Sequence, residues 1–324
     1  MTSRLEGVNC VVIGGGGFIG RAIIRALLQE GAIVRGFGRV SRFGLPDTSL
    51  PWIYGDFQDQ TALARAVEGA EIVFHLAGGS TPQRSNASLI GDIEASLVAT
   101  VQLLNVCDAE GVRRVIFASS GGTVYGVSEH IPISEDAPTN PISAYGINKL
   151  AVEKYLYLFG VQTKIEHVSL RIANPFGPNQ DPFGRQGLVA ASIFKILADD
   201  PIEIWGNGLV KRDYIYVDDV AEAFISAANY RGALTSFNIG SGDGKSVDAV
   251  VDSVADILGI RSPKKVYRPG QKADVPSNVL DISRATAELG WQPNTSWRNA
   301  ILQTAEWMRR EPTLRALLDG KKHA

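Results

Sequence analysis

The amino-acid sequence predicts an α/β protein built on a doubly wound parallel sheet, with a smaller mixed α/β lobe after it. Three observations carry this prediction. The first half alternates short, continuously apolar segments with amphipathic helical segments, which is typical of a parallel sheet covered by helices on both faces. A glycine-rich turn joins the first apolar segment to the first helical segment. Beyond about residue 174 the regular alternation stops.

The predicted strands of the first half are short apolar runs at 9–15, 32–38, 71–78, 114–120 and 165–172. Helical segments with apolar residues at i, i+3 and i+4 spacing occupy 20–31, 61–70, 94–111 and 144–160. A further short strand is expected just before residue 55. Ligands of such sheets bind beyond the carboxyl ends of the strands. The residues that directly follow the strands are therefore the candidate site residues.

The second half is less regular. A segment rich in proline and glycine at 174–187 predicts a loop, and the expected elements after it are a helix at 188–200, a strand at 202–206, and helices near 218–229, 246–258, 283–289 and 297–310. We expect a dinucleotide-binding domain over 1–174 and a substrate lobe over 175–324. Segments near 213–240 are expected to pack back on the first domain, and 319–324 to form a solvated end.

Composition limits the class of protein. The 324 residues are 45% apolar and 20% charged, with a formal net charge of −2, so nothing suggests a nucleic-acid or acidic-lipid partner. The start lacks a secretory signal pattern, and no uninterrupted apolar stretch approaches the ~20 residues of a membrane helix. We expect a cytoplasmic protein with no membrane partner. Cys10 and Cys107 are expected to be small core residues, and no metal-ligand spacing is present.

The turn after the first strand reads GGGGFIG and fits a phosphate-binding loop in two frames. Gly15, Gly17 and Gly20 match G-x-G-x-x-G, whereas Gly14, Gly17 and Gly20 match G-x-x-G-x-x-G. Glycine lets backbone N–H groups approach a pyrophosphate closely, and the helix N-terminus adds partial positive charge. Placed between a strand and a helix, the motif indicates a bound dinucleotide. The expected contacts are Gly14, Gly17, Phe18, Ile19 and Gly20.

The type of dinucleotide depends on the end of the second strand. An acidic residue about 20 residues after the loop would favour NAD, but the sequence has Gly38 and Arg39. A guanidinium can pair with a 2′-phosphate, so Arg39 favours NADP, with a solvated arginine as the alternative. Further along, Asp56 could accept a hydrogen bond from the adenine amino group while Phe57 packs beside the ring. The alternative for Asp56 is a helix N-cap.

Tyr145 and Lys149 are four residues apart at the start of a predicted helix and so share one face. A lysine ammonium beside a phenol favours the phenolate and lowers the tyrosine pKa from ~10 towards neutrality. The pair predicts a general base that works near neutral pH. The alternative is an ordinary amphipathic helix surface.

These residues resemble those of the extended short-chain dehydrogenase/reductases, in the group of nucleotide-sugar epimerases and dehydratases that includes UDP-glucose 4-epimerases. The matching stretches span most of the chain and read GGGGFIG, GDF, HLAG, SSGGTVYG, YGINK, LRIANPFGP, KRDYIYVDDVA and DVPSNVLDISRATAELGW. The resemblance implies a Rossmann domain, a tightly bound NAD or NADP, and a nucleoside-diphosphate sugar in the second lobe. It also implies a homodimer formed through helices near 90–108 and 145–158. It places Leu76, Ala77, Gly78 and Ser119 near the cofactor.

Two positions depart from the family pattern. Gly121 stands where the family usually has Ser or Thr, and Ser96 where it usually has Asn. In the family, the missing hydroxyl bridges the sugar O4 and the tyrosine. We expect Thr123 to supply it, directly or through water in the space left by Gly121, with Ser120 as the alternative. That space could equally accommodate a bulkier sugar substituent.

The same stretch indicates the reaction type. Related sugar dehydratases carry Asp-Glu where this chain has Gly122 and Thr123, and these residues cannot ionise usefully, so dehydration and decarboxylation are disfavoured. Arg212 and Arg268 are candidate diphosphate ligands because a guanidinium fits phosphate bidentately; the alternative is that they are surface arginines. The resemblance also assigns a substrate-phosphate contact to Asn174. His75 is expected to play a structural part at the end of its strand.

The prediction for function is epimerisation of a nucleoside-diphosphate sugar, such as a UDP-hexose, at C4 through a transient 4-keto intermediate. A place in polysaccharide biosynthesis would follow from the same resemblance. The alternative is an NADP-dependent reductase of nucleotide 4-keto sugars, which Arg39 favours. A non-catalytic cofactor sensor is a third possibility, and the presence of Tyr145 and Lys149 argues against it.

Overall fold

A computed structural model of the chain describes residues 5–39, 41–45, 49–78, 82–184, 186–270 and 275–322. Its main sheet has seven parallel strands in the order β10-β6-β5-β4-β1-β2-β3. In chain order they are β1 (Asn9–Ile13), β2 (Ile33–Phe37), β3 (Trp52–Ile53), β4 (Ile72–His75), β5 (Arg114–Ser120), β6 (Glu166–Ile172) and β10 (Ser236–Ile239). The chain order reverses at β1, which lies between β2 and β4. Ligands bind at this kind of switch point in doubly wound sheets.

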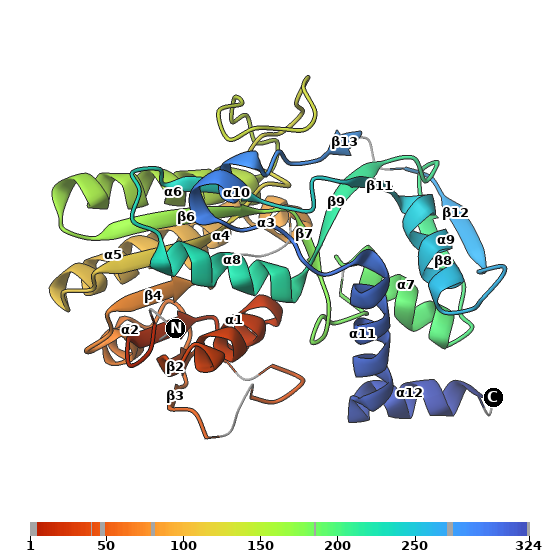
Figure 1. Cartoon of the computed structure of the whole chain (residues 1–324), viewed down its shortest axis with the longest axis horizontal. Coiled ribbons are helices and arrows are strands. Elements are labelled where there is room, and N and C mark those ends of the chain that lie inside the picture. The colour runs from red at the N-terminus through yellow and green to blue at the C-terminus, as the bar shows by residue number, and fades with distance from the viewer. Residues whose placement is uncertain are drawn as a thin grey trace.

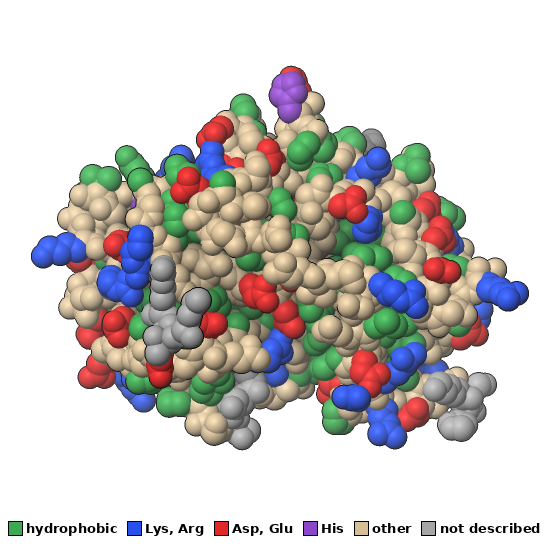
Figure 2. Space-filling view, viewed as in Figure 1, with side chains coloured by type: hydrophobic (Ala, Val, Ile, Leu, Met, Phe, Trp, Pro, Cys, Tyr) green, Lys and Arg blue, Asp and Glu red, His purple; other side chains and the backbone are tan. Residues whose placement is uncertain are grey.

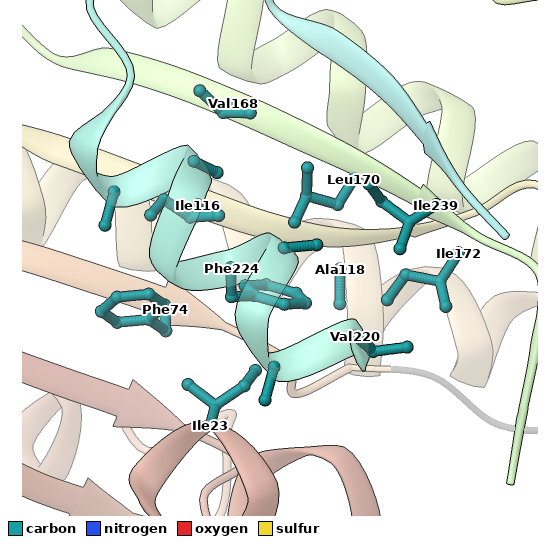
Figure 3. Packing of buried hydrophobic residues seen from close by; sticks show 14 of the residues in the cluster. Ile23, Phe74, Ile116, Ala118, Val168, Leu170, Ile172, Val220, Phe224 and Ile239 are labelled. Atoms are coloured by element: carbon teal, nitrogen blue, oxygen red, sulfur yellow. The ribbon is translucent and has the colours of Figure 1, made fainter. Parts of the chain in front are cut away.

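Helices cover both faces of the sheet, as the continuously apolar strands predict (Figure 1). On one face lie α1 (Phe18–Gln29) and α8 (Val217–Asn229); on the other lie α2 (Gln60–Val67), α5 (Ala99–Ala109) and α6 (Ala144–Gln162). Figure 3 shows Phe224 of α8 lying against Phe74 and Ile116 of the sheet. The next residue along β5, Phe117, packs into the cluster on the opposite face, as expected for side chains that alternate along a strand.

The second lobe lies beside the sheet, to the right in Figure 1. Its own apolar core is enclosed by α7 (Leu188–Leu197), α9 (Val247–Ile257), α11 (Trp297–Arg310) and α12 (Pro312–Lys322), with β8 (Ile202–Trp205) paired in parallel with β12 (Lys265–Arg268). A small mixed sheet joins β7 (Asn174–Phe176), β9 (Lys211–Tyr216), β11 (Gly244–Ser246) and β13 (Ser277–Asn278). The predicted fold class, a Rossmann-type sheet with a smaller mixed lobe, is confirmed.

The segment 217–239 lies on the main sheet, because α8 covers one face and β10 forms an edge strand. The boundary expected at residue 174 stays a prediction. Both cysteines are buried, as expected. The helix α12, which was not expected from the sequence, runs through residue 322 and buries Leu314 and Leu318 in the core of the second lobe, and the solvated end expected from residue 319 lies on its last turn. Residues 319–321 are exposed on this helix.

The helix expected at 94–111 is longer and irregular. It consists of α4 (Leu89–Asp92), a π-helical turn over Ile93–Val98, and α5. A short helix, α3 (Pro82–Ala87), precedes it and was not expected from the sequence. The run Leu89–Ala109 is long and apolar enough by length and composition to cross a membrane, with a mean hydropathy of 1.4. Within the fold, α5 lies in the helix layer between α2 and α6 and buries Leu103 and Leu104 against the sheet.

The surface carries mixed charge. Figure 2 shows acidic and basic side chains interspersed with apolar ones on the face in view, in line with the formal net charge of −2. The described residues on this face form no extended patch of one sign of the kind that binds a nucleic-acid backbone.

Candidate active site

The glycine-rich turn is packed too tightly for side chains at its key positions. Gly14 has a φ of +88°, and a Cβ there would lie 2.9 Å from the backbone N of Ala77. A Cβ at Gly20 would lie 2.5 Å from the carbonyl O of Gly14, and Gly17 N donates to that same carbonyl at 3.0 Å. A Cβ at Gly15 would likewise lie 2.8 Å from Ile24 Cδ1, so the packing is compatible with both glycine frames. Gly17 is the N-cap of α1 and has no side chain to occupy the first N–H groups of the helix.

This turn fits a dinucleotide. Backbone N–H groups at a helix N-terminus, with no side chain above them, form an anion site. The backbone of β4 continues past His75 directly beside the turn, where Leu76 N donates to Ile13 O at 2.9 Å. Gly78, with a φ of +74°, follows two residues later. The expected cofactor contacts at 14–20 and 76–78 thus lie together at the carboxyl ends of β1 and β4.

Three residues were expected around the adenosine, and they differ in how exposed they are and in what they contact. Asp56 is exposed, and its carboxylate accepts a hydrogen bond from Gln58 N at 3.1 Å. Its alternative role as a helix N-cap is wrong, because Asp59 caps α2 by accepting from Ala62 N at 3.0 Å. Phe57 is half-buried, with its ring 5.1 Å from that of His75. Arg39 is exposed and lies beside the glycine turn, since a Cβ at Gly16 would be 2.6 Å from the Arg39 carbonyl O.

His75 has the structural part expected of it. It is fully buried, its Nε2 lies 2.9 Å from Thr100 Oγ1, and its ring lies 5.1 Å from that of Phe117. Burial, with a smaller contribution from the Lys149 ammonium, lowers the His75 pKa to about 3. The imidazole is therefore neutral at physiological pH.

Tyr145 and Lys149 lie in the first turns of α6, above the carboxyl end of β5. Lys149 is buried; its Nζ donates to Ala118 O at 2.8 Å and lies 5.7 Å from the centroid of the Tyr145 ring. Burial lowers the Lys149 pKa to about 8, although Asp92 and Glu153 raise it. Ser143 caps the helix by accepting from Gly146 N at 3.2 Å.

The expected depression of the Tyr145 pKa is wrong. Burial raises this pKa to about 12, the hydrogen bond from Ser120 lowers it, and the negative charge of Asp92 raises it. The expectation rested on helical spacing, which brings the ammonium close but gives no account of desolvation. Removing a phenol from water disfavours its anion, and here that effect is the largest.

Of the two hydroxyls expected to serve Tyr145, the structure favours Ser120, the alternative, over Thr123. The Ser120 hydroxyl lies near enough to the phenol to lower the Tyr145 pKa. Thr123 Oγ1 is buried and has no hydrogen-bond partner among the described residues. The space expected at Gly121 is filled, because a Cβ there would lie 2.5 Å from Leu280 Cδ1 and 2.8 Å from Arg171 O. The more open position is Gly122, where Ser120 Oγ, at 3.9 Å, is the nearest atom to an added Cβ.

Two buried polar clusters beside the pair were not expected from the sequence. In one, Asn148 Nδ2 donates to Asp92 Oδ2 at 2.7 Å. In the other, Arg171 forms an ion pair with Glu153, 2.7 Å between Nη2 and Oε2. Ser119, expected near the cofactor, directs its hydroxyl to Glu153. Asp92 inside an apolar helical segment was the available signal for the first cluster, because a lone acid in such a segment is rarely buried without a partner.

The expected substrate residues do not all lie together. Asn174 on β7 donates its side-chain N–H to Asp213 O at 2.9 Å, and Arg212 on the neighbouring strand β9 donates to Val275 O at 2.7 Å. Arg268 lies in the separate β8–β12 sheet, exposed and paired with Glu203 at 2.9 Å. The structure therefore brings Asn174 and Arg212 onto one small sheet and leaves Arg268 outside it.

Comparisons with known proteins agree with this geometry. Residues 10–240 match the model of the NAD dependent epimerase/dehydratase family. The chain is 33% identical over 310 residues to a UDP-glucose 4-epimerase of Mycolicibacterium smegmatis, covering 93% of this chain and 99% of that protein. It is 33% identical over 308 residues to a dTDP-4-dehydro-6-deoxyglucose reductase of Escherichia coli, covering 90% and 94%.

Solved structures are similar over nearly the whole chain. The UDP-glucose 4-epimerase of Thermotoga maritima with UDP-glucose superposes with a TM-score of 0.89 at 33% identity, covering 94% of this chain and 99% of that one. The UDP-glucose 4-epimerase of Thermus thermophilus in complex with NAD has a TM-score of 0.86 at 31% identity, with coverage of 94% and 99%. Both likenesses extend through the second lobe.

The packing at Gly121 predicts that alanine substitutions at two adjacent glycines change the free energy of unfolding differently. Gly121→Ala should lower the free energy of unfolding by about 1–3 kcal/mol, because the new methyl group overpacks against Leu280 and the Arg171 backbone. Gly122→Ala should leave it unchanged or raise it by up to ~1 kcal/mol, since the methyl group meets open space and the unfolded chain loses entropy. Urea unfolding followed by circular dichroism measures both. Equal destabilisation by the two substitutions would contradict the packing at Gly121.

Proposed function

The chain belongs to the NAD-dependent epimerase/dehydratase family, and we propose that it epimerises a nucleoside-diphosphate sugar at C4 through a transient 4-keto intermediate. One observation carries the proposal: Ser120, Tyr145 and Lys149 converge at the carboxyl end of β5, next to the glycine turn. A base, a hydroxyl partner and a dinucleotide site thus lie at the same edge of the sheet. That arrangement suits reversible oxidation of a sugar hydroxyl.

Each residue has a defined part. Tyr145 accepts the proton of the sugar hydroxyl and later returns it. Ser120 stabilises the negative charge that develops on the phenol oxygen and on the sugar O4 during this transfer. Lys149 supplies positive charge beside the phenol and donates towards the cofactor ribose. A dinucleotide held at the glycine turn would supply the hydride acceptor and donor for this chemistry. Asn174 and Arg212 are proposed to contact the diphosphate of the substrate from the small sheet of the second lobe.

The choice of epimerisation rests on the residues around Ser120. Gly122 and Thr123 lie in the turn after β5 and carry no carboxylate, so these two positions offer no acid for loss of water from the sugar. The named relatives support a nucleotide sugar as substrate, since three of the four compared are UDP-glucose 4-epimerases. UDP-hexoses are therefore the substrates to test first.

A reductase of nucleotide 4-keto sugars is the second candidate. The similar reductase of Escherichia coli and the exposed Arg39 beside the glycine turn favour it. The two functions differ in how they use the cofactor. An epimerase regenerates its cofactor within each turnover, whereas a reductase consumes reduced cofactor stoichiometrically. Activity with UDP-hexoses in the absence of added reduced cofactor decides between them.

We predict that Tyr145→Phe and Ser120→Ala lower kcat while the bound dinucleotide is retained. Loss of the general base should cost at least ~10²-fold, and loss of one hydrogen-bond donor ~10²–10³-fold. Conversion of UDP-glucose to its C4 epimer, followed by chromatography, measures kcat. Mass spectrometry of the natively purified protein measures the retained dinucleotide.

Thr123→Val is the matched control, because it removes a buried hydroxyl that has no hydrogen-bond partner among the described residues. Its kcat should stay near that of the parent. A folded Tyr145→Phe variant with near-normal turnover would overturn the catalytic assignment. A crippled Thr123→Val variant beside an active Ser120→Ala variant would return the hydroxyl role to Thr123.

We also propose that the site accepts NADP, with Arg39 pairing with the 2′-phosphate. Arg39→Ala should weaken NADP binding about 10-fold or more while NAD binding changes little, because a charged hydrogen bond is worth about 1.5–3 kcal/mol. Fluorescence titration of dinucleotide-free protein measures both constants. Arg42→Ala is the control, since Arg42 is already ion-paired with Asp181 at 2.9 Å. Equal effects of Arg39→Ala on the two dinucleotides would remove this role and leave NAD favoured.

We propose a homodimer whose interface is formed by the helical run 89–109 and α6. Both helices expose large apolar side chains: Leu89, Ile90, Ile93 and Val98 on the run, and Ile147, Tyr155 and Leu158 on α6. Adjacent helices in one layer thus present an apolar surface that a second copy could cover. This interface would also account for the apolar character of the run.

Analytical ultracentrifugation should give about twice the chain mass of 34.8 kDa. Leu158→Lys should shift the protein towards the monomer, because it places a charge in the apolar interface. Leu209→Lys alters a leucine of the second lobe that is even more exposed than Leu158, and it should leave the mass unchanged. A parent protein that sediments as a monomer at micromolar concentration would contradict the dimer.

A further inference from the structure

A short loop after β2, residues 41–44, reaches the second lobe; we call this loop the clasp. It begins two residues after Arg39. Its Phe43 packs against the core of the second lobe, with the ring 5.2 Å from that of Trp307 on α11 and nearly perpendicular to it. Aromatic pairs favour this edge-to-face arrangement. The clasp thus attaches the end of β2 to the second lobe.

Arg21 joins the clasp to the glycine turn. It is the fourth residue of α1 and is only 8% exposed. Its Nη2 donates to Ser41 Oγ at 3.1 Å, to Phe43 O at 3.0 Å and to Gly44 O. Its Nε donates to Gly16 O in the glycine turn at 3.3 Å. One guanidinium therefore holds two segments together that are distant along the chain.

A guanidinium suits this position better than an ammonium. Its five N–H groups point in fixed directions from a rigid plane, so one side chain can serve the oxygens of separate segments at the same time. Burial of a cation is costly unless hydrogen bonds compensate it, and here the acceptors belong to the two segments that Arg21 joins. A lysine would keep the charge but could not reproduce these directions.

The clasp continues the segment that forms the adenosine end of the site. In doubly wound dinucleotide-binding sheets, residues after the second strand recognise the adenosine ribose. Here these residues are Gly38 and Arg39. Trp52 Nε1 donates to Gly38 O at 3.1 Å, and a Cβ at Gly16 would lie 2.6 Å from Arg39 O. The end of β2 therefore lies against the glycine turn, and Arg21 holds the clasp to the same turn.

The clasp has a further contact with the second lobe at its surface. Arg42 forms an ion pair with Asp181 at 2.9 Å, and both side chains are 40% exposed. Exposed ion pairs contribute little to stability because water screens them. Arg21 and Phe43 are therefore the side chains that matter most for holding the clasp, and Arg42→Ala remains a suitable control for dinucleotide binding.

We propose that Arg21 is a positioning residue for the adenosine end of the dinucleotide: it fixes the clasp, and with it the end of β2, against the glycine turn. The proposal rests on the dinucleotide site of the proposed function, not on the reaction at C4. Because Arg21 acts through the backbone at the end of β2, it affects NAD and NADP alike. Arg39, in contrast, is proposed to act on the 2′-phosphate alone.

The central experiment replaces Arg21 by methionine, which keeps an unbranched apolar stem and removes the guanidinium. Arg21→Met should raise the Kd of NAD about 10-fold or more, because the charged hydrogen bonds that hold the clasp are lost. The Kd of NADP should rise by the same factor. So should the Kd of ADP-ribose, which has the adenosine half and lacks the nicotinamide ring. Isothermal titration calorimetry of dinucleotide-free protein measures all three constants.

Two further variants test the cause. Arg21→Lys keeps the charge without the planar group of donors, and it should weaken the three ligands nearly as much as Arg21→Met. Arg25→Met is the matched control, because Arg25 lies one turn further along α1, is exposed, and pairs with Asp218 of α8. It should leave each Kd within about twofold of the parent, as expected for the loss of an exposed pair.

Three results would overturn the proposal. The first is an unchanged Kd of NAD in a folded Arg21→Met variant, even if epimerase activity is found. The second is a loss confined to NADP, which would make Arg21 a direct ligand of the 2′-phosphate, or a loss for NAD that ADP-ribose does not share. The third is a Kd in Arg21→Lys that matches the parent, which would reduce the role to charge.

The titrations need no sugar substrate, so they separate this proposal from the proposed function. A parent that binds NAD but does not epimerise UDP-hexoses, together with equal losses in Arg21→Met, overturns the function and leaves the positioning role standing. If Arg21→Met does not fold, Ser41→Ala decides, because it removes one acceptor of Arg21. An equal rise of about 5-fold for the three ligands supports the proposal, and unchanged constants overturn it.

Discussion

Helix α6 is held against the sheet by the buried ion pair between Glu153 and Arg171, and the active site depends on this pair. Glu153 lies one turn beyond Lys149, and Arg171 lies on β6, beside β5. Arg171 also donates to Tyr125 Oη at 3.0 Å and to Glu135 O at 3.1 Å, which ties the chain after β5 to the same point. Breaking a buried pair of this kind by removing one partner commonly costs about 3–5 kcal/mol. The helix that carries the candidate base therefore has little freedom to move.

That rigidity has an electrostatic cost at Tyr145. The burial that fixes the phenol also raises its pKa to about 12, well above the range in which it would act as a base. An added positive charge within ~4–6 Å would favour the phenolate, and an oxidised nicotinamide carries one. The strength of Tyr145 as a base would then depend on whether a dinucleotide is bound.

The sequence was sufficient for what depends on local pattern. Continuous apolar runs and i, i+3, i+4 spacing predicted the sheet and its helices, and the glycine spacing located the turn between β1 and α1. It failed where contacts join distant segments. Leu280, which is far along the chain, fills the space at Gly121. No local sequence pattern predicts this contact. The predicted direction of the Tyr145 pKa shift was wrong for a related reason. Helical spacing indicates that Lys149 is close to Tyr145, but it does not indicate how deeply the phenol is buried.

The contact at Gly121 also gives a reason for that glycine. Asn278 Nδ2 donates to Gly121 O at 3.1 Å, and Leu280 N donates to the buried carboxylate of Asp213 at 3.2 Å. A segment of the second lobe is thus seated directly on the turn that carries Ser120. A serine or threonine at 121 would push this segment away, so the lobe contact and a hydroxyl at that position exclude each other. Moving the hydroxyl one residue earlier, to Ser120, keeps both the contact and a partner for Tyr145.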